Sequence, residues 1–124
     1  MFKLMIVDDS SIIRNRIERS FKASEFEIVA TARDGVEALE KFKEFRPDLI
    51  TMDLTMPGMD GLSCIQAIYE LDPTAGILVV SALSDKMTGL LALEYGAQGF
   101  IYKPFTDEQL IEALTKIAEQ KPTV

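Results

Sequence analysis

The chain has 124 residues, enough for one domain with a packed core, and its 48% hydrophobic and 27% charged residues are ordinary for a folded soluble protein. A net charge of −7 argues against binding to DNA or RNA, which requires a basic surface, and the apolar runs are too short to span a bilayer. Histidine is absent, which excludes Ser-His-Asp and Cys-His nucleophiles, histidine zinc sites and a phosphohistidine on this chain. Cys64 is the single cysteine, which excludes an internal disulfide.

The first half of the chain is predicted to alternate strands with helices. Short apolar runs predict strands at residues 3–7, 28–30 and 48–52. Helical spacing of apolar residues predicts a helix bearing Ile13, Ile17 and Phe21 and a second helix bearing Val36, Leu39 and Phe42. Asp34 followed by Glu37 predicts the start of the second helix, and Pro47 predicts its end.

The second half continues this alternation after a turn. Residues 55–61 contain one proline and two glycines and predict an irregular turn. The same patterns predict strands at 77–80 and 99–102 and helices at 62–71, 85–95 and 107–119. Gly96 predicts the end of the fourth helix, and Thr106 with Gln109 predicts a capping box at the start of the fifth.

Strands that alternate with helices predict a parallel sheet with helices on both faces. The runs at 4–7, 49–52 and 77–80 are almost wholly apolar and belong in the centre, whereas 27–31 and 99–102 suit the edges. We therefore predict a doubly wound α/β fold of five βα units, the flavodoxin-like architecture, with a five-stranded parallel sheet in the order 2-1-3-4-5. We expect a single domain over residues 1–124 with no attached effector domain.

Four of the predicted strands end in polar residues that are able to do chemistry. These residues are Asp8 and Asp9 after the first strand, Asp53 after the third, Ser81 after the fourth and Lys103 after the fifth. Because the carboxyl ends of parallel strands meet at one edge, we expect these side chains to share a crevice. Carboxylates about 4 Å apart repel by about 4 kcal/mol at an effective dielectric near 20, so the cluster needs positive charge. Lys103 supplies one charge, and Mg²⁺, which prefers oxygen ligands, would supply the rest.

Each of these residues also has a simpler interpretation when it is taken alone. Asp9 is equally consistent with a cap on the helix that follows it, and Asp53 with the start of a turn. Ser81 is consistent with a helix cap and Lys103 with a surface lysine before a proline. Their occurrence together, at four strand ends on one side of the sheet, favours a shared functional site.

Four stretches resemble the receiver domain of the two-component response regulators. They are Val7-Asp8-Asp9-Ser10, the run from Met52 to Gly61, Ser81-Ala82 and Lys103-Pro104-Phe105. The resemblance covers essentially the whole chain and points to the single-domain, CheY-like chemotaxis regulators. It implies a cytoplasmic signalling protein rather than an enzyme, which accepts a phosphoryl group from the phosphohistidine of a sensor kinase or phosphotransfer protein. A downstream protein, such as a flagellar switch, would read the signal, and neither nucleic acid nor a membrane is an expected partner.

The resemblance assigns roles to the residues of the predicted crevice. Asp53 matches the phosphoacceptor, the nucleophile that becomes an aspartyl phosphate. Asp9 matches a direct ligand of Mg²⁺, or of Mn²⁺ in its place, and Asp8 matches a ligand that acts through water. The Asp53 carboxylate and the backbone carbonyl of Thr55 would complete the protein ligands. Lys103 would pair with the phosphoryl group and with Asp53.

The resemblance also implies a switch and an output surface. Ser81 would donate its hydroxyl to a phosphoryl oxygen, and Phe100 matches the aromatic residue that turns inward behind it. Because phenylalanine forms no hydrogen bond through its ring, this coupling would be steric. The output face of the family is the fourth helix, the fifth strand and the fifth helix, where we expect Leu93 and Tyr102 to contribute to a partner surface. The Lys103–Pro104 peptide is typically cis in this family.

Three other functions are weighed against the signalling switch. A phosphorylation-independent interaction module would not need the complete set of acceptor residues. A hydrolase of the haloacid dehalogenase type, with an aspartate nucleophile, needs an acid two residues after it, where this chain has Thr55. A flavin carrier of the same architecture needs a phosphate-binding loop after the first strand, where Asp8 and Asp9 would instead repel phosphate.

Overall fold

The computed structural model describes residues 2–21, 26–54, 61–82 and 86–120. The strands are β1 (Phe2–Val7), β2 (Phe26–Ala32), β3 (Leu49–Met52), β4 (Gly76–Ala82) and β5 (Gly99–Lys103). The helices are α1 (Ser11–Ser20), α2 (Gly35–Phe45), α3 (Gly61–Leu71), α4 (Lys86–Glu94) and α5 (Asp107–Gln120). Every strand and helix predicted from the sequence is therefore present.

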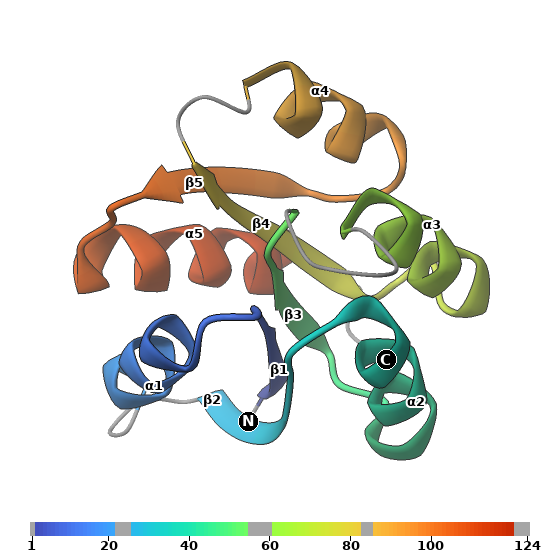
Figure 1. The fold of residues 1–124 in the computed structure, drawn as a ribbon, viewed down its shortest axis with the longest axis horizontal. Coiled ribbons are helices and arrows are strands. Elements are labelled where there is room, and N and C mark those ends of the chain that lie inside the picture. The colour runs from blue at the N-terminus through green and yellow to red at the C-terminus, as the bar shows by residue number, and fades with distance from the viewer. Residues whose placement is uncertain (1, 22–25, 55–60, 83–85, 121–124) are drawn as a thin grey trace.

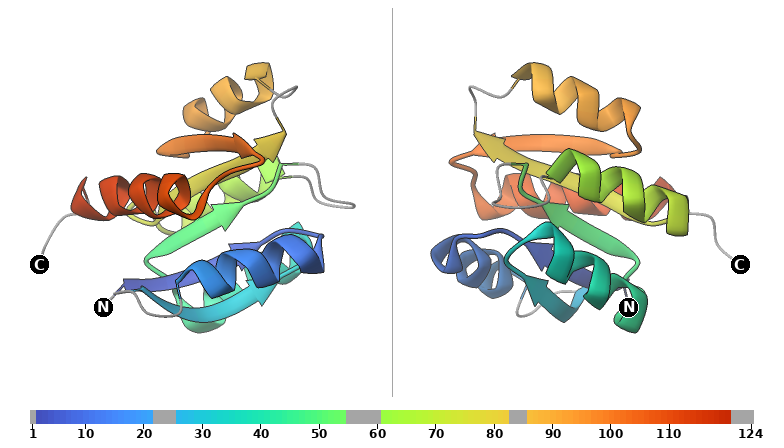
Figure 2. Two further views of the ribbon diagram at one scale, coloured as in Figure 1. Left: turned by 90° about the vertical axis from the view of Figure 1, so that its left-hand side faces the viewer. Right: turned by 45° about the vertical axis from the view of Figure 1, so that its right-hand side comes forward.

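The five strands form one parallel sheet in the order β2-β1-β3-β4-β5, which confirms the predicted α/β fold and strand order (Figure 1). The apolar strands β1, β3 and β4 lie in the centre, as predicted, and β2 and β5 form the edges. Helices α1 and α5 cover one face of the sheet, and α2, α3 and α4 cover the other (Figure 2). Among the described residues, none of the helices combines the length and the apolar character that crossing a bilayer requires.

Side chains that alternate along the central strands divide the core into two layers. In β3, Leu49 packs in the layer below α1 and α5, whereas Ile50 and Met52 pack in the layer below α2 and α3. Because both faces of these strands are buried, apolar residues fill nearly every position. The polar residues that follow the strands are consequently confined to the carboxyl edge of the sheet.

The predicted helix boundaries are formed by local hydrogen bonds. The backbone N–H of Glu37 donates to Asp34 Oδ1 at 2.8 Å at the start of α2. At the start of α5, Gln109 N donates to Thr106 Oγ1 at 3.1 Å and Thr106 N donates to Gln109 Oε1 at 2.9 Å, which confirms the capping box. Gly96, which has a φ of +125°, follows the end of α4, as predicted.

Thr51, in the middle of β3, carries a buried hydroxyl with no hydrogen-bond partner among the described residues. Replacing Thr51 with valine is expected to raise the free energy of unfolding by about 1 kcal/mol, because a polar group that was desolvated without compensation is removed. Urea denaturation measures this change. The contrasting variant is Thr74→Val, which removes a hydroxyl that donates to Asp72 Oδ1 at 2.6 Å and is expected to be slightly destabilising. A less stable Thr51→Val protein would show that the hydroxyl is satisfied in solution.

Candidate functional site

The carboxylates of Asp8, Asp9 and Asp53 come together where β1 and β3 end. The sheet ladder continues one residue beyond each strand, since Asp8 N donates to Ala32 O at 3.0 Å and Asp53 N donates to Val7 O at 2.9 Å. One carboxylate oxygen of each of the three residues lies within 4.8 Å of the others. Asp8 is 1% and Asp53 2% exposed, whereas Asp9 is exposed. The cluster is thus buried at Asp8 and Asp53 and open to solvent at Asp9.

Lys103, the last residue of β5, brings a positive charge to this cluster. Its Nζ lies 2.9 Å from Asp8 Oδ2 and 3.7 Å from Asp53 Oδ1, and its side chain is 25% exposed. The lysine is therefore closer to Asp8 than to Asp53, the partner that the resemblance implies. The Lys103–Pro104 peptide is cis, as expected. One ammonium group faces three carboxylates, which leaves an excess of negative charge.

Asp8 is fixed by the first turn of α1. Its Oδ1 accepts a hydrogen bond from Ser10 N at 2.9 Å, and its backbone carbonyl accepts one from Arg14 Nη1 at 2.6 Å. The residue that caps α1 is Ser10, whose Oγ accepts from Ile13 N at 3.3 Å. This assignment overturns the interpretation of Asp9 as a helix cap and leaves the Asp9 carboxylate for the cluster. Sequence reasoning missed Arg14, because nothing in the sequence pattern indicates which strand-end carbonyl an arginine on α1 reaches.

Ser81 lies near the carboxyl end of β4 and is 2% exposed. In the register of β4 and β5, Ser81 is paired with Tyr102, and Val79 is paired with Phe100. The sequence resemblance singles out Phe100 as the switch residue. The backbone of Ser81 is thus level with Tyr102, two residues beyond Phe100 along β5.

The three other expected residues lie on α4, on β5 or outside the described part of the chain. Thr55, the expected carbonyl ligand, falls in residues 55–60, which lie outside the described residues. Leu93 is 38% exposed on α4, and Tyr102 is half-buried on β5. Leu93 shares the exposed side of α4 with other large apolar residues, namely Met87, Leu90 and Leu91.

The carboxylate cluster fits a hard divalent cation. Three carboxylates offer oxygen atoms at short mutual distances, and among the described residues no other group of acidic, cysteine or histidine side chains meets this condition. Mg²⁺ retains several waters when it binds proteins, and the exposed side at Asp9 gives room for them. Asp8, Asp9 and Asp53 would therefore hold the ion.

Gly61, the first residue of α3, packs against the backbone that carries Asp53. Its N–H donates to Leu54 O at 3.2 Å, and an added Cβ would lie 2.5 Å from Asp53 O and 2.6 Å from Leu54 Cα. Sequence reasoning recognised this glycine only as part of a turn, because the close approach depends on how α3 returns to β3. A side chain at this position would have to displace the backbone of the carboxylate cluster.

Replacing Gly61 with alanine is consequently expected to lower the free energy of unfolding by about 2 kcal/mol, because backbone atoms cannot yield to the methyl group as a flexible side chain would. Chemical denaturation measures the loss. The matched variant is Gly99→Ala, whose Cβ would meet Leu78 Cδ1 at 3.6 Å and Ile117 Cδ1 at 3.7 Å, which are ordinary contacts. Equal stability of the two variants would contradict the close approach of α3 to β3.

Comparisons with known proteins place these features in a family context. The family model described as response regulator receiver domain matches residues 4–115. The chemotaxis protein CheY of Listeria monocytogenes is 43% identical over 119 residues, which cover 96% of this chain and 100% of that protein. CheY of Bacillus subtilis is 40% identical over 114 residues, 92% of this chain and 95% of that protein. Among solved structures, a chain of the CheX–CheY–BeF3–Mg²⁺ complex from Borrelia burgdorferi superposes with a TM-score of 0.89 at 34% identity, covering 94% of this chain and 89% of that one.

Proposed function

Because the chain belongs to the response regulator receiver family and is CheY-like, we propose that it is a phosphorylation-activated switch of a chemotaxis-type two-component system. Asp53 accepts the phosphoryl group, and the α4, β5 and α5 face then changes its affinity for a partner protein. The observation that carries the proposal is the position of the Asp53 carboxylate, which is buried beside two further carboxylates and the Lys103 ammonium. Such a site suits phosphoryl transfer to a carboxylate.

In the proposed reaction a carboxylate oxygen of Asp53 attacks phosphorus. A P–O bond to Asp53 forms as the P–N bond of the donor phosphohistidine breaks, and the departing imidazole regains its proton from water. Mg²⁺, when bound, neutralises charge on the phosphoryl oxygens. Lys103 holds a second positive charge beside Asp53, and the Ser81 hydroxyl donates to a phosphoryl oxygen. The donor histidine must come from a partner, since this chain has none.

Two observations support the proposed partners. The structure from Borrelia burgdorferi pairs a CheY with CheX and holds BeF3 and Mg²⁺. In the present chain, Leu93 on α4 is exposed and Tyr102 on β5 is half-buried, so both residues are accessible to a downstream protein. The donor would be a sensor histidine kinase or a phosphotransfer protein.

The test is phosphorylation of the purified chain by acetyl phosphate, followed by intact mass spectrometry. With Mg²⁺ present, we expect the mass of one phosphoryl group to be added, because attack by Asp53 on phosphorus releases acetate. A chelator is expected to abolish the addition, since the carboxylate cluster then lacks the charge that neutralises the phosphoryl oxygens. A chain that stays unmodified with Mg²⁺ would favour a fixed interaction module over a switch.

A further inference from the structure

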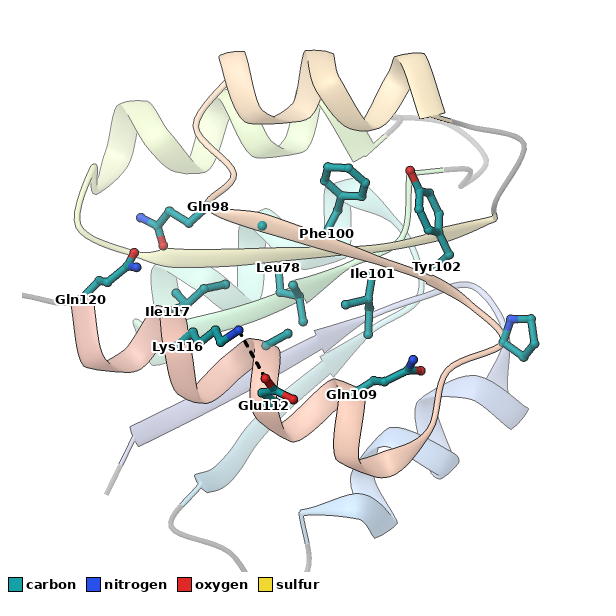
Figure 3. A pocket seen from close by; sticks show the side chains of 13 residues that line it. Leu78, Gln98, Phe100, Ile101, Tyr102, Gln109, Glu112, Lys116, Ile117 and Gln120 are labelled. Carbon is teal, nitrogen blue, oxygen red and sulfur yellow. Dashed lines mark ion pairs between the residues drawn. The ribbon is translucent and has the colours of Figure 1, made fainter.

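Lys103, whose ammonium faces the carboxylate cluster, lies on the face of the sheet that α1 and α5 cover. Figure 3 shows Ile101 pointing towards α5, whereas Phe100 and Tyr102 point to the other side of β5. Because side chains alternate along a strand, Lys103 shares the face of Ile101. Its Nζ lies 2.9 Å from Asp8 Oδ2 across the carboxyl edge of the sheet. The helices of that face, α1 and α5, are therefore the ones that border this ion pair.

An arginine of α1 ties the turn after Lys103 to the helix. Arg16 Nη2 donates to the backbone carbonyl of Phe105, two residues after Lys103, and Arg16 Cζ lies 4.7 Å from the centroid of the Phe105 ring. Phe105 is 3% exposed and packs in the core layer below α1 and α5. A guanidinium donates hydrogen bonds in its plane and stacks on aromatic rings through its face, so one side chain makes both contacts. Phe105 is thus held at its carbonyl and at its ring.

The same helix also fixes the other half of the ion pair. Arg14 Nη1 donates to Asp8 O at 2.6 Å, and Ser10 N donates to Asp8 Oδ1 at 2.9 Å. The strands that carry Asp8 and Lys103, β1 and β5, are not neighbours, because β3 and β4 lie between them in the sheet. Through its two arginines, α1 contacts the chain next to both groups of the ion pair. The helix therefore bridges two parts of the site that the sheet joins only indirectly.

We propose that Arg16 is a positioning residue for phosphoryl transfer, which fixes the Lys103 ammonium beside the carboxylates through its contacts with Phe105. This inference rests on the proposed function. Without Arg16, the turn that follows Lys103 loses its tie to α1, and the ammonium occupies a wider range of positions. A charge that stabilises a transition state acts only from the right place, and a displacement of about 1 Å can slow a reaction by about 100-fold.

Arg19 provides a matched control for the loss of charge. It lies three residues further along α1, and together with Arg16 it borders a groove of about 430 Å³ between α1 and the start of α5. Its side chain is exposed, and among the described residues its guanidinium makes no hydrogen bond to the turn after Lys103. Replacing either arginine with methionine removes one positive charge from α1, but only Arg16→Met removes the contacts with Phe105.

The rate of phosphorylation tests the role of Arg16. Each protein is treated with Mg²⁺ and acetyl phosphate, and its intact mass is followed over time. We expect Arg16→Met to be phosphorylated about tenfold more slowly than the wild type, and Arg19→Met at the wild-type rate. In the Lys103→Met background, Arg16→Met is expected to cause no further slowing, because the ammonium that Arg16 positions is gone. An arginine with a general structural role would slow both backgrounds equally.

Urea denaturation in the presence of a chelator tests the same coupling without Mg²⁺ or phosphate. Arg16→Met and Lys103→Met are each expected to lower the free energy of unfolding. If Arg16 acts through Lys103, the double variant loses less than the sum of the two single losses, because the second change removes a contact that the first has already weakened. Should Arg16→Met fail to fold, Arg16→Lys, which keeps one donor for the Phe105 carbonyl, takes its place in both measurements.

Two outcomes would overturn the inference. One is equal rates of phosphorylation for the Arg16 and Arg19 variants. The other is additive losses of stability in the Arg16 and Lys103 variants, which would show that the two side chains act independently. Absence of added mass in the wild type would instead overturn the proposed function, and the urea measurements would then decide whether Arg16 positions Lys103.

Discussion

Replacing Asp53 with asparagine is expected to abolish phosphorylation by acetyl phosphate. Asparagine has the shape of aspartate but lacks the anionic oxygen that attacks phosphorus. The backbone hydrogen bond from residue 53 to Val7 O, 2.9 Å long in the native protein, does not depend on the side chain. Intact mass after treatment with Mg²⁺ and acetyl phosphate measures the effect. The matched control is Asp48→Asn, at the opposite end of β3, which is expected to be phosphorylated like the wild type.

The stability of the Asp53→Asn protein distinguishes lost chemistry from lost structure. Carboxylate oxygens that lie within 4.8 Å of one another repel by at least about 3 kcal/mol at an effective dielectric near 20. Removing one of the three charges therefore relieves two repulsions at the expense of one attraction to Lys103. Without Mg²⁺, we therefore expect the variant to be at least as stable as the wild type. Mg²⁺ is expected to stabilise it less, since one ligand is gone. A variant that still gains a phosphoryl group would place the acceptor elsewhere.

The sequence alone predicts the five-stranded sheet and the clustering of the polar residues that follow its strands. The runs at β1, β3 and β4 are apolar throughout because both faces of a central parallel strand are buried, and this requirement is visible without coordinates. Once the strand order is known, Asp8 and Asp53 must be neighbours, because β1 and β3 are adjacent. The capping box of Thr106 and Gln109 involves residues only three positions apart, so the sequence pattern alone predicts it.

Details that depend on register and on side-chain reach were not predictable. Whether Phe100 or Tyr102 is the register partner of Ser81 is decided by how β4 and β5 are aligned, and no local pattern in either strand determines that alignment. The preference of Lys103 for Asp8 depends on the path of a long flexible side chain across the sheet edge. The contact of Gly61 with the Asp53 backbone depends on how α3 returns to β3. Each of these features arises from tertiary packing rather than from neighbouring residues.

Replacing Lys103 with methionine is expected to lower the free energy of unfolding by about 3 kcal/mol when Mg²⁺ is absent. Removing one partner of a buried ion pair costs about 3–5 kcal/mol, and the lower end applies because the lysine side chain is 25% exposed. Methionine retains an apolar stem, so the loss is mainly electrostatic. Urea denaturation in the presence of a chelator measures it. The control is Lys116→Met, which breaks an exposed pair with Glu112 at 3.3 Å and should change stability by about 0.5 kcal/mol.

Mg²⁺ is expected to reverse most of the loss in Lys103→Met while leaving Lys116→Met unaffected relative to the wild type. A ligand that binds only the folded state stabilises it in proportion to the logarithm of its concentration over the dissociation constant. Without the ammonium of Lys103, the carboxylates of Asp8 and Asp53 depend on the cation alone for neutralisation, so the stabilisation by Mg²⁺ should be larger than in the wild type. Equal stabilisation of both variants by Mg²⁺ would mean that Lys103 and the ion do not neutralise the same charges.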